Sequence, residues 1–89
     1  MIRGETTIRN DVGLHLRSAG SFVRLAAKFK SQIRVSTPGV GAVDGKSILG
    51  LVTLGAVQGS PLTITAEGPD EDAAVRTLIQ LVEDRFNEA

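Results

Sequence analysis

The alternation of apolar and polar residues changes several times along the chain, and each change marks a new element. Residues 2–9 alternate, with Ile2, Thr6 and Ile8 on one face and charged residues on the other, which is typical of a strand with one buried side. The stretch "NDVG" then predicts a turn, because three of its four residues are turn formers. From residue 16 to residue 29, apolar residues recur at helical spacing, which predicts an amphipathic helix.

The remaining chain shows both patterns again. Alternation predicts three more strands, at 32–37, 40–45 and 60–68, with the turn "PGVG" between the first two. A short apolar segment at 46–55 and a longer periodic segment at 70–86 predict two more helices. The apolar stripe expected on the last helix comprises Ala74, Leu78, Leu81, Val82 and either Arg85 or Phe86.

Capping residues support both of these helices. Ser47 is a good N-cap for the short segment, and Gly55 can end it. Asp70 can cap the last helix, where Glu71 and Asp72 complement the positive end of the helix dipole.

The predicted element order is therefore β-α-β-β-α-β-α. Each of the four strands has a single apolar face, so the helices must cover that face and leave the other open. We expect an α+β fold in which three helices pack on one side of a four-stranded antiparallel sheet. A chain of 89 residues has room for one core, so residues 1–89 form one domain.

Composition narrows the possible functions. Ten basic and ten acidic residues give a net charge near zero, which argues against a nucleic-acid-binding module. One histidine and no cysteine exclude the usual zinc sites, and the lack of disulfides suits a reducing cytosol. No apolar run is long enough for membrane insertion, and the start of the chain lacks a signal-peptide pattern. We expect a soluble cytoplasmic protein that is a monomer.

The single histidine, His15, lies where the helix at 16–29 begins. The first N–H groups of a helix lack helical partners and, with the helix dipole, favour an anion. Arg17 adds a guanidinium that can hold phosphate oxygens in pairs. A neutral imidazole is a good nucleophile, so reversible phosphorylation of His15 fits this arrangement. On local sequence alone, His15 as an ordinary polar loop residue stays an open alternative.

Two long motifs carry a resemblance to a known family. The stretch "GLHLRSAGSFV" resembles the active-site segment of HPr, the histidine-containing phosphocarrier of the bacterial phosphotransferase system, whose common form reads GLHARPA. Residues 45–74, "GKSILGLVTLGAVQGSPLTITAEGPDEDAA", resemble its second signature. The resemblance covers residues 2–86 and implies an open-faced β-sandwich, the same architecture that the periodicity predicts.

The resemblance also implies a role for each matching residue. His15 would receive a phosphoryl group on Nδ1 from phosphorylated enzyme I and pass it to an enzyme IIA domain. Arg17 would stabilise the phosphate, together with the backbone N–H groups of Leu16, Arg17 and Ser18. Such a protein is a stoichiometric carrier without a cofactor or resident metal, and it is not an enzyme.

Two residues depart from the family motif. Ser18 stands where proline is usual, so we expect a slightly looser start of the helix. Its hydroxyl and its backbone N–H could both donate to a phosphate. Leu16 replaces a smaller residue and places apolar bulk beside His15, where it could extend a docking surface or narrow access.

A second group of matching residues concerns regulation and docking. Ser47 matches the serine that a dedicated kinase/phosphorylase modifies in some bacterial lineages, although its position also fits a simple helix cap. Apolar residues of the short helix resemble the patch that docks enzyme I and enzyme IIA, while Leu51 and Leu54 are expected in the core. The predicted docking residues are Leu16, Gly20, Arg24, Ile48, Leu49 and Val52.

Two alternatives to a sugar-transport carrier remain open. The chain could be a regulatory protein of the same fold, in which the phosphorylation states of His15 and Ser47 control partner proteins without sugar import. It could also be a carrier remnant that docks partners without phosphotransfer.

Overall fold

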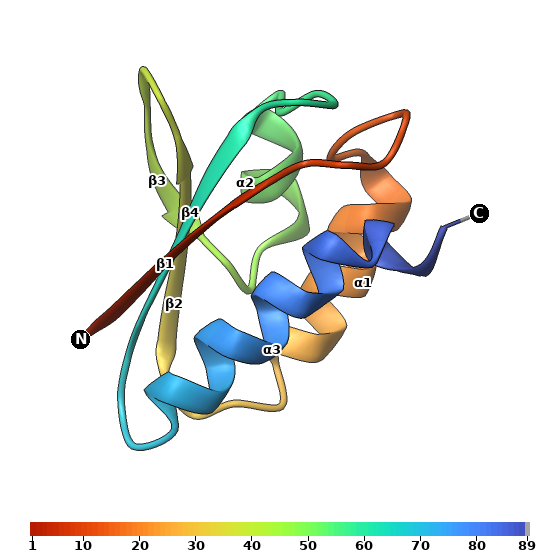
Figure 1. The fold of residues 1–89 in the computed structure, drawn as a ribbon. Helices are drawn as coiled ribbons and strands as arrows, with labels where there is room; N and C mark the ends of the chain where they lie inside the picture. The colour runs from red at the N-terminus through yellow and green to blue at the C-terminus, as the bar shows by residue number, and fades with distance from the viewer. Residues whose placement is uncertain (89) are drawn as a thin grey trace.

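In a computed structural model, which describes residues 1–88, the chain forms one antiparallel sheet covered by helices on a single face (Figure 1). The strands lie in the order β1-β4-β2-β3, and every neighbouring pair is antiparallel. This confirms the predicted four-stranded antiparallel sheet. The strands are β1 (Ile2–Thr7), β2 (Gln32–Thr37), β3 (Val40–Asp44) and β4 (Pro61–Glu67).

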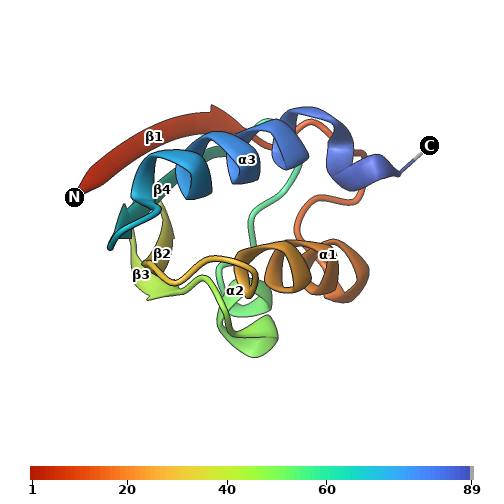
Figure 2. The same ribbon diagram turned by 90° about the horizontal axis from the view of Figure 1, so that it is seen from below.

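Three α-helices lie on the same side of the sheet and leave its other face open, as predicted (Figure 2). They are α1 (Leu16–Ala26), α2 (Ile48–Thr53) and α3 (Glu71–Glu83), and a short turn, η1 (Arg85–Asn87), follows α3. None of the helices within residues 1–88 combines the length and hydropathy that crossing a bilayer requires.

The core lies between the sheet and this helical layer. Inward residues of the two central strands are at most 1% exposed, because alternation places every second side chain beneath the helices. These inward residues are Ile33 and Val35 of β2 and Leu62, Ile64 and Ala66 of β4. Leu51 and Leu54 are buried, as expected from the sequence.

The edge strand β1 packs against α3 at a glycine. A Cβ added at Gly4 would collide with Cδ1 of Ile79 and would lie 2.6 Å from Cγ1 of Val75. Gly4 therefore lets the helix approach the strand more closely than a side chain would allow. This close approach fixes α3 over the sheet.

Two helices are shorter than the sequence predicts. Helix α1 ends at Ala26 instead of residue 29, and the N–H of Phe29 turns back to the carbonyl of Ala26. Phe29 still packs against the core, which explains why its spacing extended the predicted helix. Helix α3 ends at Glu83 instead of residue 86. The backbone of η1 then adopts a left-handed conformation, with φ of 58° at Arg85, 55° at Phe86 and 62° at Asn87.

The stripe predicted on the last helix is buried, and the open choice at its end falls to Phe86, which is 3% exposed. Asp70 occupies the N-cap position of α3, as predicted, but its side chain makes no capping hydrogen bond to the helix. Its carboxylate instead accepts hydrogen bonds from the backbone N–H groups of Lys30 and Ser31 and from the Ser31 hydroxyl. Asp70 thus ties the start of α3 to the loop before β2.

Candidate functional site

A tight turn places His15 at the start of α1. Gly13 adopts φ of +73°, and a Cβ there would lie 2.5 Å from the carbonyl oxygen of Ala56. Only glycine combines this left-handed conformation with such a close approach. The N–H of Leu14 then donates to the same Ala56 carbonyl at 2.9 Å. This contact anchors the loop that carries His15 to the segment between α2 and β4.

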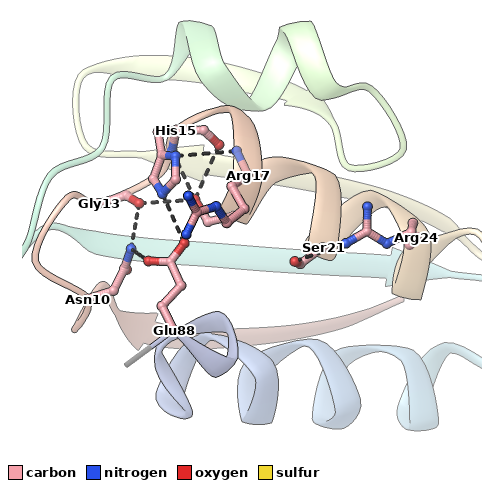
Figure 3. Close-up of polar contacts among 8 residues, drawn as sticks. Asn10, Gly13, His15, Arg17, Ser21, Arg24 and Glu88 are labelled. Atoms are coloured by element: carbon pink, nitrogen blue, oxygen red, sulfur yellow. Dashed lines mark hydrogen bonds and ion pairs between the residues drawn. The ribbon is translucent and has the colours of Figure 1, made fainter.

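His15 is itself the N-cap of α1, and its ring contributes to the cap. The backbone N–H of Arg17 donates to Nδ1 of His15 at 3.3 Å, while Nε2 lies 2.9 Å from a carboxylate oxygen of Glu88 (Figure 3). An N–H donor requires a lone pair on Nδ1, and a carboxylate acceptor requires a proton on Nε2. Both partners therefore assign the same neutral tautomer, with the proton on Nε2.

Ser18 completes the cap from the opposite direction. Its Oγ accepts from the backbone N–H of His15 at 2.9 Å, and its hydroxyl lies within hydrogen-bond distance of the Gly13 carbonyl at 3.0 Å. This is the reciprocal arrangement of a capping box, with serine as the third helical residue. The Ser18 side chain is fully buried. Its hydroxyl is therefore not the phosphate donor we expected, and it tightens the helix start that we expected to be looser.

Two residues that the sequence did not indicate, Asn10 and Glu88, lie on the Nε2 side of the site. Nδ2 of Asn10 donates to the Gly13 carbonyl at 2.7 Å and to Oε1 of Glu88 at 3.0 Å. Asn10 is 1% exposed, and the Glu88 side chain is 13% exposed. Local patterns could not reveal this contact, since Glu88 lies 73 positions after His15. The only sequence signal was an asparagine within a predicted turn.

The reactive parts of the site face solvent. The side chain of His15 is one third exposed, and Arg17 is exposed beside it. The Arg17 guanidinium makes no ion pair with any residue between 1 and 88. An anion at Nδ1 would therefore meet the first backbone N–H groups of α1 and the Arg17 guanidinium. The site suits a nucleophilic imidazole that acquires an anionic group.

Most of the predicted docking residues are exposed near this site. Helices α1 and α2 pack together, and Leu49 is 77% and Leu16 69% exposed. Ile48, Val52 and Arg24 are also exposed. Gly20 is an exception, because it is buried and a Cβ there would meet Nη1 of Arg24 at 3.4 Å. Arg24 therefore lies over Gly20, and a contact of Gly20 with a partner stays a prediction.

Ser47 occupies the N-cap of α2, as its sequence position predicted. Its Oγ accepts from the N–H of Gly50 at 3.1 Å. The side chain is partly exposed, and the next residue is Ile48, one of the predicted docking residues. Among residues 1–88, no group of three or more histidine, cysteine or acidic side chains is arranged to hold a metal ion.

The fold and the site define a class of small α+β proteins that present one imidazole at the start of a helix. The family model described as "PTS HPr component phosphorylation site" matches residues 2–84. The phosphocarrier protein HPr of Cupriavidus necator is 42% identical over 88 residues, which cover 99% of this chain and 98% of that protein. The chain belongs to the HPr family, whose members are phosphocarriers of the phosphotransferase system.

Solved structures agree with this assignment. The crystal structure of HPr-C-His from Thermoanaerobacter tengcongensis is 42% identical, with a TM-score of 0.93, and the match covers 100% of this chain and 99% of that one. A crystal structure described as an HPr dimer from the same organism matches with a TM-score of 0.77 at 42% identity, over 99% and 100% of the two chains. The open-faced fold is therefore that of HPr proteins.

Proposed function

We propose that this protein accepts a phosphoryl group on Nδ1 of His15 from phosphorylated enzyme I and passes it to an enzyme IIA domain. The observation that carries the proposal is the position of Nδ1, whose lone pair accepts a long hydrogen bond of 3.3 Å from the Arg17 N–H at the start of α1. The Nδ1 lone pair attacks phosphorus, and the bond from phosphorus to the donor breaks as the new P–N bond forms. The reverse exchange transfers the group to the acceptor histidine and returns the electron pair to Nδ1.

The surroundings of His15 stabilise the charge that this transfer brings. The backbone N–H groups of Leu16, Arg17 and Ser18 belong to the first turn of α1, where the dipole favours an anion. The Arg17 N–H that donates to Nδ1 would turn to a phosphate oxygen once the P–N bond forms. The Arg17 guanidinium pairs with the remaining oxygens.

Partner docking is proposed for the apolar patch formed by Leu16, Ile48, Leu49 and Val52. These side chains lie on neighbouring helices close to His15, and Arg17 and Arg24 add positive charge at the edge of the patch. An apolar centre with a basic rim suits a partner with the complementary pattern, as enzyme I and IIA domains would provide. We propose a cytoplasmic location and a monomeric state for this carrier.

Intact-mass spectrometry tests the proposal directly. The protein is incubated with phosphoenolpyruvate and enzyme I, and His15→Ala is the matched control. The expected result is one added phosphoryl group that is lost in mild acid and absent from the control. No mass gain in the presence of active enzyme I would overturn the proposed transfer.

A regulatory role is the second candidate, and the position of Ser47 favours it. The Ser47 side chain is partly exposed, and the next residue, Ile48, belongs to the apolar patch. A phosphate added there by a dedicated kinase/phosphorylase would place about two negative charges beside the docking surface. Incubation with that kinase and ATP, with Ser47→Ala as control, tests whether the site is modified. Loss of enzyme I binding after modification would support control of partners through Ser47.

A further inference from the structure

We propose that Glu88, oriented by Asn10, is a positioning residue that holds His15 in the Nε2–H tautomer and so directs phosphorylation to Nδ1. The inference rests on the proposed function for the biological donor. Its central claim, the choice between the two ring nitrogens, concerns only residues of this chain and can be tested without a partner protein.

The geometry around Nε2 leaves little freedom to the ring. One carboxylate oxygen of Glu88 lies 2.9 Å from Nε2, and the other accepts from Nδ2 of Asn10 at 3.0 Å. Asn10 is held in turn by its second contact, to the Gly13 carbonyl. Figure 3 shows Glu88 below the ring at Nε2, while the Arg17 N–H lies beside the ring at Nδ1. The carboxylate therefore occupies the space from which an electrophile would reach Nε2.

The backbone after α3 is shaped to bring Glu88 to this position. Arg85, Phe86 and Asn87 all have positive φ, a conformation that costs energy for residues other than glycine. Phe86 is 3% exposed within this turn and packs into the core. The buried phenyl ring offsets the backbone cost and fixes the direction in which the chain continues toward His15.

Fixing the tautomer has a chemical consequence. A neutral imidazole has one nitrogen with an available lone pair, and the hydrogen bond of the other nitrogen selects which one. When Nδ1 attacks phosphorus, positive charge develops on the ring and is shared with the Nε2–H group. The proton stays on Nε2, where the Glu88 carboxylate stabilises the charge, as the carboxylate does in a Ser-His-Asp triad. When the P–N bond breaks, the electron pair returns to Nδ1 and the neutral tautomer is restored.

Phosphoramidate, a small phosphoryl donor, tests the choice of nitrogen without enzyme I. The imidazole attacks its phosphorus, a P–N bond forms on the ring, and ammonia leaves. The products are identified by ¹⁵N and ³¹P NMR, which distinguish the two phosphohistidine isomers. The ¹⁵N shifts of the free ring report the tautomer directly. The variants are Glu88→Ala, Glu88→Gln and the control Glu67→Ala, which removes an exposed carboxylate from β4.

Wild type and Glu67→Ala should show the Nε2–H tautomer and give only the Nδ1 isomer. Glu88→Ala should populate both tautomers and yield a mixture of isomers. Glu88→Gln keeps an acceptor for Nε2–H, so it should retain Nδ1 selectivity. With enzyme I as donor, however, Glu88→Gln should lower the maximal transfer rate roughly tenfold to a hundredfold with an unchanged KM, because the charge is lost.

Two results would overturn the inference: an unchanged isomer distribution in Glu88→Ala, or wild-type ¹⁵N shifts showing the proton on Nδ1. Failure of the proposed function looks different. In that case enzyme I leaves wild-type His15 unmodified, while phosphoramidate and the tautomer shifts still decide the role of Glu88.

Discussion

The buried hydroxyl of Ser18 accepts a hydrogen bond from the backbone N–H of His15 at 2.9 Å. This bond closes the start of α1. Ser18→Ala should lower the free energy of unfolding by about 1 kcal/mol, because it removes a helix cap and leaves a partly buried N–H without its partner. Urea denaturation measures the loss.

Ser21→Ala is the matched control for this change. The Ser21 hydroxyl accepts only an exposed hydrogen bond from Arg24 on the next turn, at 3.3 Å. Its removal should cost less than about 0.5 kcal/mol. Equal losses in the two variants would show that the Ser18 cap does not stabilise the helix.

Asp70 should account for part of the loss of folding stability at acid pH. The Ser31 hydroxyl and the backbone N–H of Lys30 lower the pKa of Asp70 below its ordinary value of 3.8. The unfolded chain therefore binds this proton first as pH falls. The stabilisation is complete above about pH 4 and is lost as pH falls through the lower folded pKa.

The variant Asp70→Asn tests this pH dependence. It should be less stable than wild type at neutral pH, and its stability should fall less steeply below pH 4. Asp72→Asn, which removes an equal charge from the first turn of α3, is the matched control. Denaturant titrations at several pH values provide the measurement, and parallel curves for Asp70→Asn and wild type would contradict the assignment.

The contact between β1 and α3 predicts that alanine substitution will lower stability at Gly4 but not at Gly41. Gly4→Ala should destabilise the fold by about 1–3 kcal/mol, since the new methyl group would collide with Ile79 and with the buried Val75. Gly41→Ala in β3 is the control, because a Cβ there meets nothing within 4 Å. Thermal denaturation should show a lower Tm for Gly4→Ala alone. A similar Tm for both variants would mean that the helix shifts to accommodate the methyl group at little cost.

A substitution in the apolar patch should weaken partner binding without lowering the stability of the fold. Leu49→Glu should weaken binding to enzyme I by about tenfold or more, since it places a charge at the centre of the proposed interface. Stability should change little, because Leu49 is 77% exposed. Val40→Glu makes the same change at an exposed position of β3. Calorimetric titration with enzyme I compares the two, and equal affinities would place the docking surface elsewhere.

The sequence predicted those features that depend on local periodicity. Alternation at Ile33 and Val35 and again at Leu62 and Ile64 specified the inward faces of the central strands, and those residues are buried. The helical stripe that includes Leu78 was equally readable. The predicted helix ends were less accurate, because Phe29 and Phe86 continue the apolar spacing from turns that follow the helices.

The site was only partly predictable for a similar reason. His15 and Arg17 lie next to a recognisable helix start, so their proximity followed from the chain itself. The contact of Glu88 with the ring depends on how the segment after α3 packs against the start of α1, which local patterns do not reveal. Asp70 shows the same limit. Its sequence position predicted a side-chain cap for α3, but its carboxylate accepts a hydrogen bond from the backbone N–H of Ser31 in the loop before β2.

The distance of Glu88 from His15 along the chain has a consequence for biosynthesis. During synthesis His15 is added early, whereas Glu88, which faces Nε2, is added 73 residues later. Loop closure over that length is completed only when the last turn docks on the folded body. Before that turn docks, the imidazole would be unrestrained, and reactivity confined to one ring nitrogen would arise only afterwards.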